Sequence, residues 1–211
     1  RTAYLGARST EADLARAVDA LGSGPSIVKP NGLGSSLLVE RHAALDLATL
    51  SRLRAKAYPY SCELLVQEYV HGEEYTAGCL EIGEGITVLP IIRAVTAGCF
   101  LGHEEKHGRG LVRPDIVDAD TAIAARISDI SHNLFRAFDF LGMCRFDYIL
   151  GDDGNLYFLE ANTLPGLASG SAYTLMLTHA GYSMVDLITA CIAAARARPR
   201  RSKVLRYQID A

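Results

Sequence analysis

The chain has 211 residues, of which 49% are hydrophobic and 21% charged, and its formal net charge is -3. These values fit a globular protein with a buried core and exclude a strongly basic nucleic-acid-binding protein. No apolar run is long enough to span a bilayer, and no signal peptide is recognisable. The five cysteines form no pair with metal-binding spacing, and their odd number favours reduced thiols. The sequence therefore predicts a cytoplasmic protein without nucleic-acid or membrane partners.

The first third of the chain predicts two helices that alternate with short strands. Thr10 and Asp13 have the spacing of a capping box, and Gly22 stands where the helix that follows them would end. The next expected elements are a strand over 25–30, a small-residue loop over 31–36, a strand over 37–40, a helix over 42–57 and a strand over 64–70. The loop over 31–36 would then be the tip of a hairpin.

The rest of the chain predicts strands that pair with near neighbours, covered by a few helices. The expected elements are strands over 75–82 and 86–92 around a turn at 83–85, a mobile polar loop over 101–114, a helix over 123–134, strands over 144–150 and 156–159 joined by a turn at 151–154, and a helix over 184–197. In the last helix, Val185, Ile188 and Ile192 fall on one face. Together these elements predict an α+β fold.

Lys29 precedes a loop of small residues at 31–36 that could hold phosphate. Glycine lets backbone N–H groups approach phosphate oxygens closely, and Lys29 would add a positive charge. The loop lacks the spacing of a P-loop. Taken alone, the stretch is explained more simply as a hairpin turn with a surface lysine.

Two pairs of polar residues lie on the strands expected to form the second hairpin. Side chains alternate along a strand, so Arg145 and Asp147 point the same way, as do Glu160 and Asn162. If the strand register brings these faces together, two carboxylates and an amide oxygen converge, which suits Mg²⁺. The alternative is a pair of surface salt bridges, which the hydrophobic neighbours disfavour. A Pro-Gly turn follows at 165–166, placing loop residues beside this site.

Together these stretches resemble the D-alanine–D-alanine ligase branch of the ATP-grasp superfamily. The resemblance runs from about residue 25 to 190 and is carried, in the family's order, by residues 27–30 with 34–36, 65–76, 89–90, 104–106, and 145–147 with 159–166. It implies an ATP-grasp fold of two α+β subdomains that clasp ATP. These would be a central subdomain over 1–74, incomplete at its start, and a C-terminal subdomain over 75–211 with the metal and substrate site. The family's N-terminal domain, with a further ATP-contacting lysine, would be absent from this chain.

The resemblance also implies which residues bind nucleotide and metal. Glu68 and Val70 would hold adenine through backbone groups beside Gln67, and Glu74 would bind the ribose. The residues implied to contact the ATP phosphates are Lys29, Ser36 and Lys106. Asp147, Glu160 and Asn162 would bind Mg²⁺, with Mn²⁺ as an alternative ion.

The implied reaction joins D-alanine to a second D-amino acid or D-hydroxy acid, as in the synthesis of peptidoglycan precursors. ATP would phosphorylate the first carboxylate, and the second substrate would attack the resulting acyl phosphate. Arg145 would stabilise the oxyanion, and Lys106 and Ser35 would assist catalysis. The residues implied to contact substrate are Ser35, His107, Arg145, Gly166 and Ser171. The family is commonly dimeric, so a homodimer is expected.

Three positions depart from the family's pattern and leave the acceptor open. Leu33 and Gln67 stand where a Glu is usual, and His107 stands where dipeptide ligases have a Tyr. A histidine here resembles the D-alanine–D-lactate ligases, because a protonated His107 could repel an ammonium nucleophile while tolerating a hydroxyl. Two alternatives stay open: another ATP-grasp carboxylate–amine ligase and a non-catalytic ATP-binding module. The cysteines are expected to be packing residues.

Overall fold

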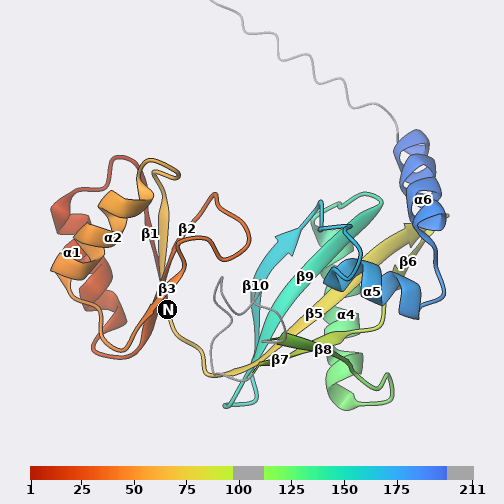
Figure 1. The fold of residues 1–211 in the computed structure, drawn as a ribbon, viewed down its shortest axis with the longest axis horizontal. Coiled ribbons are helices and arrows are strands. Elements are labelled where there is room, and N and C mark those ends of the chain that lie inside the picture. The colour runs from red at the N-terminus through yellow and green to blue at the C-terminus, as the bar shows by residue number, and fades with distance from the viewer. Residues whose placement is uncertain (97–111, 199–211) are drawn as a thin grey trace, which may run out of the picture. The chain divides into compact units, whose positions relative to one another are not determined.

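A computed structural model describes residues 1–96 and 112–198 (Figure 1). The chain divides into two compact units. Of the described residues, unit 1 contains 1–74, 94–96, 112–115 and 149–157, and unit 2 contains 75–93, 116–148 and 158–198. The assignment of these parts to two catalytic subdomains stays a prediction.

Unit 1 is built on an antiparallel sheet with the strand order β1-β4-β2-β3. Its strands are β1 (Thr2–Leu5), β2 (Ser26–Pro30), β3 (Glu40–His42) and β4 (Leu64–Glu68). Helices α1 (Glu11–Leu21) and α2 (Leu47–Ala57) share a hydrophobic core with the sheet, which includes Leu14, Leu50, Val28 and Val66. Val28 points into this core, so its neighbour Lys29 points to the opposite face of the sheet.

The first predicted hairpin exists, but its loop is longer than expected. β2 and β3 pair antiparallel, yet β3 begins at Glu40 rather than at residue 37. The reason is local: Ser35, Ser36 and Leu38 have positive φ angles of 55–57°, which are incompatible with a strand. The loop therefore extends over 31–39.

Helix capping explains where the helices of unit 1 begin. The Thr10–Asp13 capping box is present at α1, and Gly22 ends that helix, as predicted. The second helix begins at Leu47, not at residue 42, because the Asp46 side chain accepts a hydrogen bond from the Thr49 N–H and fixes the first turn there.

The larger sheet has the strand order β10-β9-β5-β7-β8, with β6 also paired to β5. Its strands are β5 (Gly72–Ile82), β6 (Gly85–Val88), β7 (Ile92–Thr96), β8 (Val112–Ile116), β9 (Met143–Gly151) and β10 (Leu156–Asn162). The β5–β6 turn and the β9–β10 hairpin confirm two predictions, but the strand expected over 86–92 was wrong, because β6 ends at Val88 and β7 begins at Ile92. The expected loop over 101–114 was wrong at its end, because residues 112–114 belong to β8; residues 97–111 lie outside the described part.

Helices pack on both faces of this sheet. α4 (Ala122–Ala137) covers one face, where the buried hydroxyls of Ser131 and Tyr148 lie 2.8 Å apart. α5 (Ala172–His179) covers the other, where the Tyr173 hydroxyl donates to the Cys79 carbonyl at 2.8 Å. Asp147 alternates with Tyr148 along β9, so it points away from α4.

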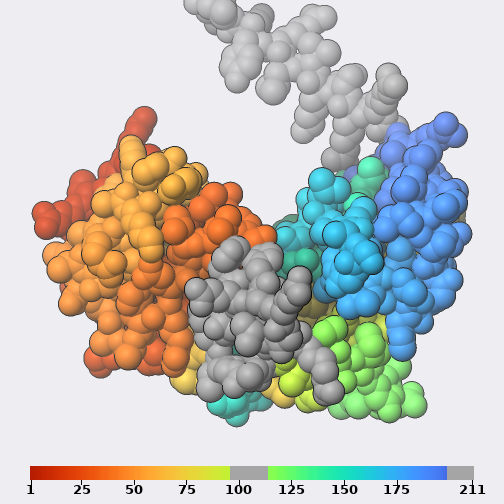
Figure 2. Space-filling model, in the orientation of Figure 1, coloured from red at the N-terminus to blue at the C-terminus, as the bar shows by residue number. Residues whose placement is uncertain are grey.

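α6 (Met184–Ala197) follows α5 and matches the predicted final helix. Its Leu187 is buried in the core shared with α5. The predicted apolar face, by contrast, is exposed at Val185 (71%), Ile188 (52%) and Ile192 (49%), on the helix that forms the blue surface in Figure 2. Across the described residues, no single helix is both long and apolar enough to span a membrane; α5 and α6 would pass that test only as a pair bent by 98°.

Candidate active site

The β9–β10 hairpin brings together the four polar side chains that the sequence singled out. Arg145 donates from Nε and from a terminal nitrogen to the two oxygens of Asp147, at 3.0 and 2.7 Å. Asn162 Nδ2 lies 3.1 Å from both Asp147 Oδ2 and Glu160 Oε1. The convergence predicted from strand alternation is therefore confirmed, and the cluster includes an Arg145–Asp147 ion pair.

Thr76 is a member of this cluster that the sequence analysis did not assign. Its hydroxyl donates to Asp147 Oδ1 at 3.0 Å from β5, the strand next to β9. The only signal in the sequence was its place two residues after Glu74, in a segment already assigned to nucleotide binding. A hydroxyl at this position can hold the Asp147 carboxylate in one orientation.

The cluster is partly shielded from water, with side-chain exposures of 23% for Arg145, 16% for Asp147 and 54% for Glu160. Burial alone would lower the pKa of Arg145, but the charge of Asp147 and the hydrogen bonds to it outweigh burial and raise that pKa. Arg145 is therefore a permanent cation. Beside it, the more exposed Glu160 keeps an oxygen 4.0 Å from the guanidinium.

The donor chemistry of this cluster fits a magnesium ion. Asp147, Glu160 and Asn162 all carry hard oxygen donors, and one atom of Asn162 already lies 3.1 Å from both carboxylates. Rotation of the Asn162 amide would exchange its N–H donors for the oxygen that a cation needs. Among the described residues no group of three or more His, Cys, Asp or Glu side chains could hold a metal, so the amide is needed to complete the set.

Ser171 and Gly166 lie together at the start of α5. The Ser171 hydroxyl donates to the Gly166 carbonyl at 2.6 Å and lies 3.0 Å from the Thr174 hydroxyl. Ser171 is the N-cap residue of α5, yet its side chain makes no capping hydrogen bond. The first N–H groups of α5 thus lack this usual acceptor, and the positive end of a helix favours a carboxylate. This geometry suits the carboxylate-binding role implied for Ser171.

In unit 1, Lys29 and Gln67 share the sheet face that points away from the helices. Gln67 pairs with Ile27, the neighbour of Lys29 on that face, and its Nε2 donates to the Thr2 hydroxyl at 3.2 Å. Glu68 pairs with Ser26 and so points to the other face, which leaves only its backbone for a ligand on the Lys29 face. That arrangement is compatible with the backbone role implied for Glu68.

The other nucleotide residues lie in two segments of unit 1. Ser35 and Ser36 occupy the 31–39 loop, where they adopt consecutive left-handed conformations. Val70 lies in the connection between β4 and β5, and Glu74 is the third residue of β5. Lys106 and His107 lie outside the described residues.

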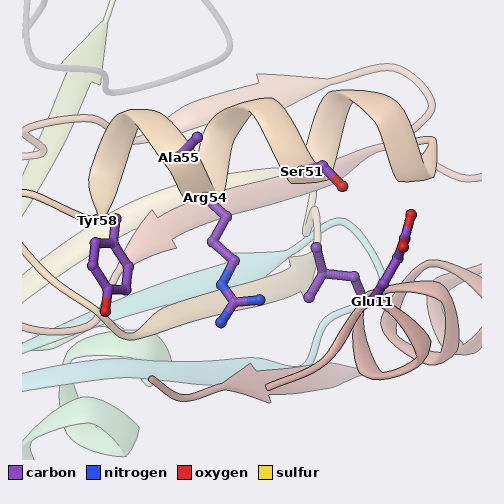
Figure 3. Close-up of a pocket in the computed structure, with 6 residues that line it drawn as sticks. Glu11, Ser51, Arg54, Ala55 and Tyr58 are labelled. Atoms are coloured by element: carbon purple, nitrogen blue, oxygen red, sulfur yellow. The ribbon is translucent and has the colours of Figure 1, made fainter. Parts of the chain in front are cut away.

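Unit 1 also contains a hollow of about 310 Å³, which is lined by residues of α1 and α2 and by the C-cap of α2 (Figure 3). Figure 3 shows Ser51, Arg54 and Ala55 on α2, Tyr58 at the C-cap of α2, and Glu11 on α1. Arg54 donates to the backbone carbonyls of Gly6, Ala7 and Ser9. Its charge is thus committed to holding the chain between β1 and α1, and the hollow contains none of the predicted site residues.

The sequence profile of the family described as D-ala D-ala ligase C-terminus matches residues 5–193. The chain belongs to this family. A D-alanine–D-alanine ligase A from Pseudomonas putida is 32% identical over 182 residues, which cover 83% of this chain and 50% of that ligase. The chain spans about half the length of the curated relatives it matches.

Solved structures show the same fold. A D-alanyl-alanine synthetase A from Vibrio cholerae superposes with a TM-score of 0.76 at 22% identity, over 92% of this chain and 59% of that one. A Bacillus anthracis D-alanine–D-alanine ligase complexed with ATP gives a TM-score of 0.71 at 22% identity, over 93% and 60%. The α+β fold is therefore the ATP-grasp fold, as the resemblance implied.

Proposed function

We propose that this chain forms the nucleotide-binding and metal-binding part of an ATP-dependent ligase. The ligase joins D-alanine to a second D-amino acid or D-hydroxy acid and so makes peptidoglycan precursors in the cytoplasm. The observation that carries the proposal is the cluster of Arg145, Asp147, Glu160 and Asn162 on one hairpin. The family to which the chain belongs supports the choice of substrate, and the relatives named above do not favour another carboxylate–amine ligase.

The chemistry begins with a carboxylate, which is a poor electrophile. One of its oxygens attacks the γ-phosphorus of ATP, ADP leaves, and the product is an acyl phosphate. Asp147, Glu160 and Asn162 would hold Mg²⁺ or Mn²⁺, which neutralises phosphate charge when bound. On unit 1, Lys29, Ser35 and Ser36 would contact phosphates, and Gln67, Glu68, Val70 and Glu74 would contact the nucleoside. Lys106 would add a positive charge.

The second step forms the new bond. The nucleophile of the second substrate attacks the acyl carbon, gives up its proton, and phosphate leaves. Arg145, a permanent cation, would stabilise the oxyanion of the tetrahedral intermediate. Ser171, Gly166 and the α5 N-terminus would bind the second substrate's carboxylate. His107 would influence whether the nucleophile is an amine or a hydroxyl. Because members of the family are commonly dimeric, a homodimer is the expected oligomeric state.

The first test is ADP release by the full-length protein that carries this chain, supplied with Mg-ATP. We expect release with D-alanine, at pH 6 and pH 8. Stimulation by D-lactate at the lower pH would support an ester-forming role for His107, whereas dipeptide as the sole product at pH 6 would rule it out.

Asn162→Ala separates an enzyme from a binding module. We expect it to lower turnover by about 10²-fold or more, since it removes one ligand of the metal site. Asn133→Ala, on the exposed side of α4, should leave turnover unchanged. Equal activity in both variants, or ATP binding without any ADP release by the wild type, would contradict the proposal.

A further inference from the structure

The tip of the β9–β10 hairpin, residues 149–157, groups with unit 1, although the rest of both strands groups with unit 2. The tip contacts the segment 68–74, which runs from the end of β4 to the start of β5 and which the proposed function assigns to adenine and ribose. The Asp152 N–H donates to the His71 carbonyl at 3.0 Å. This contact joins two backbone atoms, so it does not depend on the side chains of Asp152 and His71.

Gly72 allows an unusually close approach between the segment and the tip. A Cβ atom at Gly72 would lie 2.1 Å from the Leu150 carbonyl oxygen and 2.8 Å from the Gly151 Cα. Gly72 does not have a positive φ, so the glycine is needed for space and not for its dihedral freedom. Any side chain here would force the two backbones apart.

The tip is internally braced, so it can act as a rigid support. Asp153 accepts hydrogen bonds from the Tyr157 hydroxyl at 2.7 Å and from Asn155 Nδ2 at 2.7 Å. The turn closes with hydrogen bonds from the Gly151 N–H to the Asn155 carbonyl and from the Gly154 N–H to the Gly151 carbonyl, both 2.8 Å. Because the tip is rigid, it can hold the backbone that it contacts at His71 and Gly72 in a fixed position.

Two further contacts tie the segment down. The Tyr69 ring lies 4.3 Å from the Arg41 guanidinium carbon and 4.6 Å from the His71 ring.

We propose that the hairpin tip positions the 68–74 segment for adenine recognition, with Gly72 as the positioning residue that permits the close contact. The inference rests on the proposed function and deepens it. The strand that supports this segment through Leu150 and Gly151 also carries Arg145 and Asp147.

The test compares Gly72→Ala with Gly24→Ala in the full-length protein. The control adds the same methyl group in unit 1 where nothing lies within 4 Å and φ is not positive. Steady-state ADP release is measured with ATP and with GTP. For Gly72→Ala we expect KM for ATP to rise about tenfold, with kcat at saturating ATP within about threefold of wild type. The ratio of kcat/KM for ATP to kcat/KM for GTP should fall about fivefold or more, because a displaced 68–74 segment discriminates adenine from guanine less well.

A purely structural role for Gly72 predicts a different result, in which both nucleotides lose activity equally and the ratio is unchanged. That outcome, or a Gly72→Ala protein that behaves like Gly24→Ala, would overturn the inference. Failure of the wild type to use ATP would instead overturn the proposed function, so the two failures are distinguishable.

Tyr157→Phe keeps the test decisive if Gly72→Ala does not fold. It removes only the hydroxyl that braces Asp153, on a side chain that is 37% exposed. We expect KM for ATP to rise about threefold without a change in kcat. Tyr4→Phe is the matched control, since the hydroxyl of the 56% exposed Tyr4 also hydrogen-bonds a carboxylate, that of Glu63. An identical KM in the two variants contradicts the proposal.

Discussion

The two units hold their candidate site residues in different ways. In unit 2, Arg145, Asp147, Glu160 and Asn162 form one hydrogen-bonded cluster on a single hairpin. In unit 1, the candidates are spread over two strands, a strained loop and a connecting segment. The candidate site of unit 2 therefore depends on the geometry of its side chains, whereas the candidate site of unit 1 depends on the positions of its backbone segments. Substitutions should therefore act on chemistry in unit 2 and on binding in unit 1.

The largest effect is expected from Asp147→Asn. The change removes the charge that faces Arg145 while keeping the size of the side chain, so turnover should fall by about 10²–10³-fold. The guanidinium, only 23% exposed, would lose its ion pair, and the free energy of unfolding should fall by about 1–3 kcal/mol after allowance for solvent screening. ADP release and thermal unfolding measure the two effects.

Asp139→Asn provides the control for Asp147→Asn. Asp139 pairs with Arg198 at 2.6 Å, with exposures of 56% and 38%. An exposed ion pair of this kind contributes about 0.5 kcal/mol or less. If the two substitutions destabilise the protein equally, the Arg145–Asp147 pair is an ordinary surface pair, and the contrast between the units fails.

The next effect concerns alkaline pH and falls on unit 2. Burial raises the pKa of the Cys79 thiol to about 12, and burial followed by the charge of Asp147 does the same for Cys144. Burial also raises the pKa of Tyr148 to about 12. Because these pKa values are higher in the folded than in the unfolded state, the un-ionised groups contribute their full stabilisation to the folded state below about pH 8. That stabilisation is lost as the pH rises. At pH 10, ionisation of each of these two thiols in the unfolded chain should lower the free energy of unfolding by about 2 kcal/mol.

Thermal unfolding at pH 7 and pH 10 under reducing conditions checks this prediction. Cys144→Ala should reduce the loss of stability on going to pH 10, because one buried thiol no longer ionises on unfolding. Cys62→Ser in unit 1 should not reduce it, since Cys62 is exposed and so was not the packing residue that the sequence predicted. Equal pH dependence in both variants would show that the buried thiols are not responsible.

The contrast between the units also explains what the sequence could predict. The cluster of unit 2 could be predicted because its residues lie close in sequence, on two strands joined by a short turn. There, the alternation of side chains along each strand decides which side chains meet. α1 and α4 were equally predictable, because a capping box marks the start of α1 and apolar periodicity marks α4. In each case a local rule was sufficient.

Features set by distant contacts escaped prediction. β1 is too short to be recognised without its partner β4, and α5 has little amphipathic pattern because it is buried on several sides. The apolar periodicity of α6 did not show which side enters the core, where Leu187 and not Val185 is buried. The roles of Lys29 and Glu68 stay predictions, because a binding role depends on a ligand and not on the fold alone.

A smaller effect is expected in the strained loop of unit 1. Ser36 has a φ of 55°, a conformation that costs an L-residue about 1 kcal/mol and glycine almost nothing. Ser36→Gly should therefore raise the free energy of unfolding by about 1 kcal/mol, although it weakens ATP binding if the hydroxyl contacts phosphate. Gly83→Ala, at a φ of 62° in open space, should lower stability by about 1 kcal/mol. Urea unfolding measures both. A loss of stability in Ser36→Gly would mean that the serine side chain, and not relief of strain, dominates there.

The smallest effect is acid sensitivity, which should fall mainly on unit 1. Both of its helices use a carboxylate in their caps, and hydrogen bonds from Thr10 and Thr49 lower the pKa values of Asp13 and Asp46. Their stabilising contribution is therefore present above pH 4 and lost as pH falls through the depressed values. In unit 2, α4 is capped by the hydroxyl of Thr121, which does not titrate, and only α6 relies on a carboxylate. Asp46→Asn keeps a good N-cap but cannot be protonated, so it should match the wild type at pH 7 and lose less helical circular dichroism between pH 4 and pH 2.5. If its acid transition coincides with that of the wild type, the cap of α2 does not limit stability in acid, and acid unfolding begins elsewhere.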